Sequence, residues 1–147
     1  MIGNGELKNF LHSEATARRF GVNPTGHAGM GAKVSVGPDW FEIARTPGTT
    51  TDAEHLDHTT TSDAFVLVES LNALHAGVKA SQGAFSLPFD GWLVNNGERT
   101  SIEAATIAGD IRDVLKSIVQ IEHTPVVTHE GVCPHIWVDG LAITGDA

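Results

Sequence analysis

The chain has 147 residues, a formal net charge of −9 and a mean hydropathy of −0.03. This length favours one domain over residues 1–147 with a hydrophobic core of its own. The acidic balance and the scattered Lys and Arg residues argue against direct nucleic-acid binding. The sequence has no apolar run long enough to span a membrane and no secretory signal near its start, so we expect a cytoplasmic protein.

The first part of the chain predicts one short helix among turns. Asn4-Gly5 is a strong turn dipeptide, but only three residues precede it, so we expect the chain to begin inside a structural unit. Residues 13–20 are predicted to be helical, because Ser13 can cap the first turn and Gly21 suits the position after the last. A glycine-rich loop and two short strands should follow, around residues 33–36 and 40–43.

The middle of the chain predicts a loop, a buried strand and a hairpin. Residues 46–63 are polar and indicate an exposed loop, whereas the apolar run 64–69 has the length and β-branched content of a strand buried on both faces. Asn96-Gly97 then predicts a tight turn between two strands of a hairpin. The inward positions before this turn should be Phe85, Leu87, Phe89 and Leu93.

The last third predicts a second helix and two closing strands. Asp110 is the expected N-cap residue. One buried helix face should carry Ile111, Val114, Leu115 and Ile118. Residues 125–128 and 135–143 read as strands. With hairpins dominating, the predicted fold is α+β, a largely antiparallel β-sheet with two main helices.

Several segments, in order along nearly the whole chain, resemble the C-terminal region of TldD/PmbA proteins, a family also labelled modulator of DNA gyrase. The most distinctive are Asn72-Ala-Leu-His-Ala-Gly-Val, Gly83-Ala-Phe-Ser, Gly91-Trp-Leu-Val-Asn-Asn-Gly-Glu and Thr106-Ile-Ala-Gly-Asp. Gly5-Glu-Leu, Thr16-Ala-Arg-Arg-Phe-Gly and Pro24-Thr-Gly-His-Ala match as well.

The resemblance implies a larger parent protein that takes part in peptide processing, with a metal-binding His-Glu-x-x-x-His helix upstream of this chain. It also implies a TldD-type cysteine ligand followed by a Gly- and Gln-rich stretch. Cys133 lacks that stretch, so the chain is closer to the PmbA type, which has no metal of its own. We therefore expect no cofactor in this chain, and zinc only in the parent family or a partner subunit.

Two histidine-containing segments are candidate sites. Asn72 and His75, in the family-like loop, are the predicted substrate-binding residues, although they could instead cap a turn and satisfy a buried carbonyl. His129, Cys133 and His135 have donor types that suit zinc and form an alternative metal site. The favoured explanation there is a loop with a buried thiol and surface imidazoles.

Two further groups of side chains have simpler explanations. His55 and His58, with neighbouring acidic residues, read as a solvated cluster, and Asp110 as a helix cap with no catalytic role.

The leading functional hypothesis is a C-terminal scaffold or substrate-groove part of a TldD/PmbA-type protein. It would pair with another TldD/PmbA-type subunit, as a homo- or hetero-oligomer, around a peptide channel, and would not be catalytic alone. Whether the chain is an enzyme is left open, because the His-Glu-x-x-x-His motif is absent from it. The alternatives are a stand-alone metallohydrolase using Cys133 and nearby histidines, and an interaction module modulating DNA gyrase.

Overall fold

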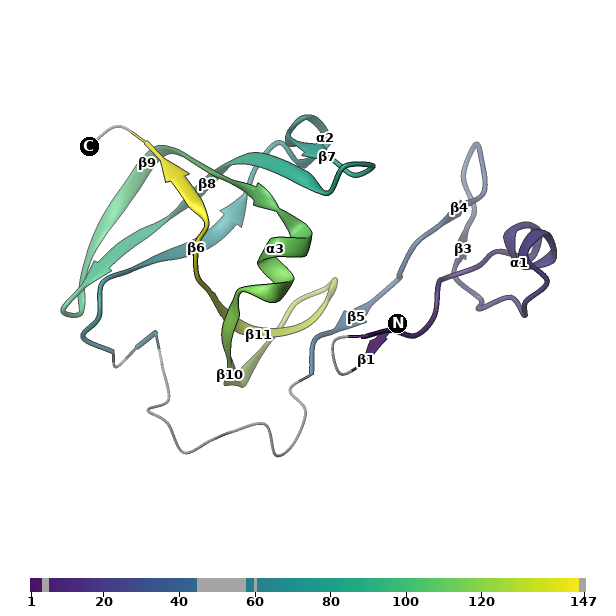
Figure 1. The fold of residues 1–147 in the computed structure, drawn as a ribbon, viewed down its shortest axis with the longest axis horizontal. Helices are drawn as coiled ribbons and strands as arrows, with labels where there is room; N and C mark the ends of the chain where they lie inside the picture. The colour runs from purple at the N-terminus through teal and green to yellow at the C-terminus, as the bar shows by residue number, and fades with distance from the viewer. Residues whose placement is uncertain (4–5, 45–57, 60, 146–147) are drawn as a thin grey trace. The chain divides into compact units, whose positions relative to one another are not determined.

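The computed structural model describes residues 1–3, 6–44, 58–59 and 61–145 (Figure 1). The helices are α1 (Glu14–Phe20), α2 (Leu74–Gly77) and α3 (Ile111–Lys116). The strands are β1 (Ile2–Gly3), β2 (Glu6–Leu7), β3 (Ala28–Gly29), β4 (Ser35–Val36), β5 (Phe41–Glu42), β6 (Phe65–Leu71), β7 (Val78–Lys79), β8 (Ala84–Asn95), β9 (Glu98–Asp110), β10 (Ile118–Val127), β11 (Gly131–Val138) and β12 (Ala142–Thr144). None of the described helices has the length and apolar character that a bilayer span requires.

The chain divides into two compact units. The first unit comprises residues 1–50 and 125–134, and the second unit comprises residues 51–124 and 135–147. The expected polar loop, residues 46–63, lies largely outside the described residues.

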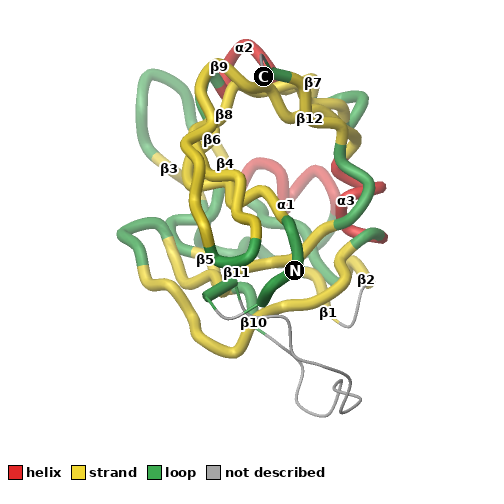
Figure 2. Tube along the Cα trace, turned by 90° about the vertical axis from the view of Figure 1, so that its left-hand side faces the viewer, coloured by secondary structure: helices red, strands yellow, loops and turns green. Residues whose placement is uncertain are grey.

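The second unit is built on an antiparallel sheet with the strand order β12-β9-β8-β6, and β7 also pairs with β8. Figure 2 shows β6, β8 and β9 running side by side. The tight turn predicted at Asn96-Gly97 joins β8 to β9, and both residues have positive φ angles, 49° and 78°, as a type I′ turn requires. The predicted α+β class with a largely antiparallel sheet is therefore confirmed, although the helices are three and short.

The core of the second unit lies on one face of this hairpin, around Leu87, Phe89, Ala105 and Ile107. The predicted inward alternation holds up to Phe89 and then fails. Leu93 is 44% exposed, whereas its neighbour Val94 is 2% exposed. The reason is that the ladders on both sides of β8 shift register near residues 89–91, which ends the simple period of two.

Strand β6 differs from the expected strand buried on both faces. It lies at the edge of the sheet, and its side chains are half-buried at the start and exposed toward Leu71. On its outer side, no strand among the described residues pairs with it. Apolar composition alone did not distinguish an edge strand from a central one.

Helix α3 begins as predicted but does not bury the predicted face. The Asp110 side chain accepts a hydrogen bond from the backbone N–H of Arg112 and caps the helix. Ile111 and Leu115 are, however, 48% and 53% exposed, and the helix ends before Ile118, which belongs to β10. Val114 and Ile118, the other two members of the predicted stripe, are half-buried.

The first unit consists of short elements. Helix α1 has the predicted cap: Ser13 and Thr16 form a capping box, and Gly21 ends the helix in the left-handed conformation. The short strands expected near residues 33–36 and 40–43 are β4, which pairs with β3, and β5, which pairs in parallel with β11. Across the predicted first turn, β1 and β2 pair as a minimal hairpin, so the three residues before that turn suffice for a partner strand.

The first unit buries little apolar surface. Among its described residues, the buried apolar side chains are Ala17 and Pro134. Its large exposed apolar side chains include Phe10, Phe20, Met30, Val34, Trp40 and Phe41.

Candidate functional site

Three segments of the second unit bring two histidines and a glutamate together. His58 precedes β6, Glu122 lies on β10 and His135 lies on β11. One potential ligand atom from each residue lies within 4.8 Å of the others. The two imidazole rings have centroids 4.1 Å apart and are tilted by 35°. We call these three residues the His–Glu–His cluster.

Glu122 is the centre of the cluster and is only 7% exposed. Its Oε1 accepts hydrogen bonds from the backbone N–H of His58, at 3.0 Å, and from the indole Nε1 of Trp137, at 2.9 Å. Its Oε2 lies 2.9 Å from Nδ1 of His58 and 3.7 Å from Nδ1 of His135. Nδ1 of His58 is also 3.1 Å from Oε1, so this imidazole faces both carboxylate oxygens.

The environment of Glu122 favours its charged form. Burial opposes ionisation, but hydrogen bonds from His58 and Trp137 outweigh it, and the pKa of Glu122 lies below its usual value. The carboxylate is therefore negative at neutral pH, as a cation ligand must be.

Phe65 packs against the indole of Trp137. The ring of Phe65, at the start of β6, lies 4.8 Å from the ring of Trp137. This contact restricts the indole that donates to Glu122.

The sequence did not reveal this cluster. The interpretation of His58 as part of a solvated group is wrong, since its side chain is half-buried and bonded to Glu122, 64 positions away. His55, grouped with it in the sequence, lies outside the described residues. The three residues come from separate segments that only the fold brings together, so no local spacing in the sequence links them. The eight histidines of the chain were a reason to search for a site.

The predicted substrate-binding residues lie at the end of the edge strand. Asn72 follows β6; its backbone N–H donates to the carbonyl of Pro88, and its Nδ2 donates to Oδ2 of Asp90 at 2.7 Å. The Ser70 hydroxyl donates to the same oxygen, and these side-chain hydrogen bonds lower the pKa of Asp90. His75 is exposed on α2.

Of the alternative metal set, one member belongs to the His–Glu–His cluster and two lie elsewhere. His135 is near Glu122, as described. His129 is 90% exposed, with Nε2 3.7 Å from Oε1 of Glu130. Cys133 donates to the carbonyl of Pro134, and burial raises the pKa of its thiol, which disfavours the thiolate that zinc binds.

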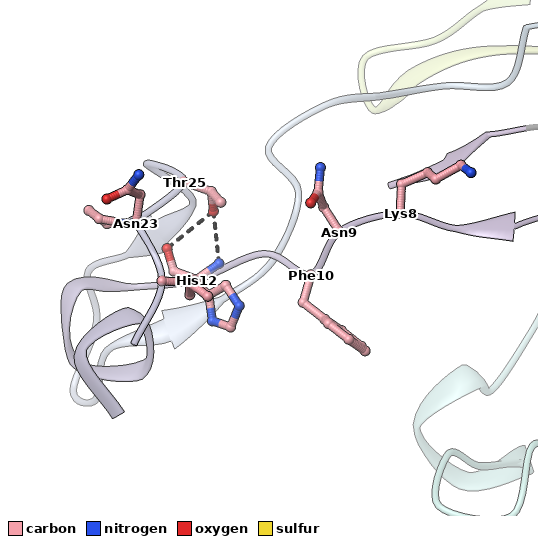
Figure 3. A pocket seen from close by; sticks show the side chains of 8 residues that line it. Lys8, Asn9, Phe10, His12, Asn23 and Thr25 are labelled. Atoms are coloured by element: carbon pink, nitrogen blue, oxygen red, sulfur yellow. Dashed lines mark hydrogen bonds between the residues drawn. The ribbon is translucent and has the colours of Figure 1, made fainter. Parts of the chain in front are cut away.

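A separate pocket of about 480 Å³ lies in the first unit (Figure 3). Residues from Lys8 to His12 and from Val22 to Thr25 line it. At its side, the Thr25 hydroxyl accepts from the backbone N–H of His12 and donates to the His12 carbonyl. These bonds tie together the two segments that flank α1. None of the predicted site residues lines this pocket.

Comparison with known proteins agrees with the fold. The family model described as "PmbA/TldA metallopeptidase C-terminal domain" matches residues 1–145. Among solved structures, a protein from Thermotoga maritima described as a "putative modulator of a DNA gyrase" is similar, with a TM-score of 0.67 and 28% sequence identity. The match covers 97% of this chain and 32% of that chain. Comparison with curated proteins gives no match.

These matches define the class of protein as a metallopeptidase-family C-terminal domain. The chain belongs to the TldD/PmbA family and corresponds to its C-terminal domain. It spans about a third of the length of the solved structure that it matches.

Proposed function

We propose that this chain is the scaffold and substrate-groove part of a TldD/PmbA-type peptide-processing protein, and that it does not cleave peptides alone. The observation that carries the proposal is the open outer edge of β6, which ends at Leu71, just before Asn72. The family's description as a metallopeptidase supports a peptide as the ligand.

An extended peptide can pair with such an edge through main-chain hydrogen bonds. Strand β6 is seven residues long, and β8 occupies only its inner side. An exposed edge of this length readily pairs with another strand unless something blocks it. A peptide that binds here would run along β6 toward Asn72 and α2.

Asn72 and His75 would then contact the end of the bound peptide. The bond from Asn72 Nδ2 to Asp90 orients the amide, so that its oxygen is the group that would accept a peptide N–H. His75 would supply a further polar contact from α2. The metal for cleavage would come from the parent family or a partner subunit.

Hydrogen exchange and peptide titration test this groove. On adding a labelled unstructured peptide, the amides of β6 should gain protection, whereas those of β12, at the opposite edge, should not. Asn72→Ala and His75→Ala should each weaken binding about two- to tenfold, the value of one hydrogen bond. His129→Ala, which removes an exposed imidazole of the first unit, is the matched control.

Peptide cleavage gives an independent check. The purified chain should leave the peptide intact by mass spectrometry, and cleavage should require a metal-bearing TldD/PmbA-type subunit. Cleavage by the chain alone, or protection that avoids β6, would contradict the proposal.

The same proposal places the chain in a cytoplasmic homo- or hetero-oligomer with a TldD/PmbA-type subunit. It includes no direct contact with nucleic acid or membrane, in keeping with the net charge of −9.

A second candidate function follows from the similar Thermotoga maritima protein, whose description names a DNA gyrase. In this alternative the chain is an interaction module whose acidic surface contacts the topoisomerase. A pull-down at low salt decides it, because the absence of gyrase from the bound fraction would dismiss the alternative.

A further inference from the structure

The family description implies a metal ion, which raises the question of whether any residues of this chain suit one. The His–Glu–His cluster offers two imidazole nitrogens and a carboxylate oxygen. This donor set is common in zinc and non-haem iron sites. It consists of His58, Glu122 and His135, and is separate from the upstream helix motif that the resemblance implies.

The two distances from the Glu122 carboxylate to the imidazoles are close to those around a single ion. Zinc–ligand bonds of about 2.0–2.1 Å in tetrahedral geometry place neighbouring ligand atoms about 3.4 Å apart. Oε2 of Glu122 lies 2.9 Å from Nδ1 of His58 and 3.7 Å from Nδ1 of His135, on either side of that value. An ion among these atoms would replace a proton on His58, and the donor atoms of all three residues lie within 4.8 Å of one another.

The surroundings of Glu122 also resemble those of carboxylates that bind metal ions. Metal-binding carboxylates are commonly oriented by hydrogen bonds from neighbouring groups. Here the indole of Trp137 and the backbone N–H of His58 hold Oε1 of Glu122. Nδ1 of His58 lies near both oxygens, at 3.1 Å and 2.9 Å, and His135 lies nearer Oε2. A simple ion pair would need only one histidine, whereas two lie against the same nearly buried carboxylate.

We propose that His58, Glu122 and His135 bind one divalent transition-metal ion, with Zn²⁺ as the preferred ion and water completing its coordination. Two imidazoles disfavour Ca²⁺ and Mg²⁺, which take oxygen ligands. The ion links the segment before β6 to β10 and β11. Its role is to fix the start of the edge strand. This inference does not depend on peptide binding.

Zinc binding to the purified full chain is the direct test. Isothermal titration and metal analysis of the metal-free chain should show one equivalent of Zn²⁺. Each of His58→Ala, Glu122→Gln and His135→Ala should weaken binding by at least about 100-fold, because loss of an orienting group alone costs 10–100-fold. Trp137→Phe, which removes one orienting hydrogen bond, should weaken Zn²⁺ binding by about 10–100-fold.

Matched controls separate this site from the other histidines. His129→Ala and Cys133→Ser should bind Zn²⁺ as the unmodified chain does. Co²⁺ substitution should give visible bands without the near-ultraviolet thiolate transition. Loss of binding in Cys133→Ser together with normal binding in His58→Ala would overturn the proposal, as would absence of stoichiometric binding in the unmodified chain.

A measurement on the unmodified chain tests the proposal even where the variants fail to fold. In a nuclear magnetic resonance titration with paramagnetic Co²⁺, the indole N–H signal of Trp137 should shift or broaden first, since this group donates to Glu122. The indole signals of Trp40 and Trp92 serve as internal controls. Effects centred on either of them, with Trp137 unchanged, would contradict the proposal.

Discussion

At the residue scale, Asp110 combines a helix cap with an ion pair. Its Oδ1 accepts from the backbone N–H of Arg112 at 2.8 Å and from the guanidinium Nε at 2.9 Å, and its Oδ2 lies beside Nη2. Hydrogen bonds from the Arg112 side chain, and then from its backbone, lower the pKa of Asp110 to about 2.

The lowered pKa of Asp110 predicts an acid-dependent contribution to stability. A group with a depressed folded-state pKa stabilises the fold above its unfolded pKa, which is 3.8 for this residue, and this contribution disappears as the pH falls toward 2. The melting-temperature difference between the unmodified chain and Asp110→Asn should therefore be constant near neutral pH and shrink below about pH 4. Thermal unfolding across pH measures it.

The exposed β9 carboxylate of Glu103 provides the control for this series. Glu103→Gln should show no comparable narrowing of the difference below about pH 4. A difference for Asp110→Asn that persists unchanged to pH 2 would show that the ion pair contributes nothing measurable.

Gly91 marks a close approach between β8 and β6. A Cβ atom at this position would lie 2.1 Å from the carbonyl oxygen of Leu67, a backbone atom that cannot move aside. We expect Gly91→Ala to lower the free energy of unfolding by more than about 2 kcal/mol. Urea denaturation measures it. Gly37→Ala, where the added Cβ meets nothing within 4 Å, should change stability by less than about 1 kcal/mol.

At the scale of elements, substitutions in the β8–β9 hairpin test which of its side chains belong to the core. Phe89 is 2% exposed within the core, whereas Leu93, placed inward by the sequence pattern, is 44% exposed. Phe89→Ala should cost about 3–5 kcal/mol in chemical denaturation, and Leu93→Ala less than about 1 kcal/mol. Equal losses would mean that the alternation continues unbroken through the register shift.

The sequence predicted correctly those caps and turns that depend on residues close together in the chain. The cap of α1, the Asn96-Gly97 turn and the Asp110 cap each depend on a few neighbouring residues, and all three are present. Register shifts, the edge position of β6 and the exposure of Leu115 depend on partners far along the chain. Sequence patterns do not report those partners.

The same distinction applies to the sites. Asn72 and His75 were predicted from the family resemblance. In the structure Asn72 directly follows β6, and His75 lies on α2. The His–Glu–His cluster escaped because its members are distributed over three segments and only the fold brings them together. His135 was named from the sequence with partners on its own loop, whereas in the structure it lies beside Glu122 and His58.

At the scale of the whole molecule, exposed apolar side chains predict association. Phe10 and Met30 of the first unit are 65% and 95% exposed, and large exposed apolar patches usually mark interaction surfaces. We expect the chain to form a dimer or larger assembly, measured by light scattering over a range of concentrations. Phe10→Ser and Met30→Ser should weaken this association without lowering the melting temperature.

A monodisperse monomer at every concentration would contradict that prediction. The exposed Val126 and Val127, which also belong to the first unit, provide a second pair of positions for the same comparison.

The pairing of β5 with β11 has a consequence for the order of folding. It joins Phe41 to Gly131 in parallel, so the first unit combines residues 1–50 with residues 125–134. Contacts this distant in sequence form slowly, because a long loop must close before they contribute stability. The β8–β9 pairing joins residues that are close in sequence, so we expect it to form early. During synthesis, the first fifty residues therefore emerge long before their partner strand, and the first unit is not complete until residues 125–134 have emerged.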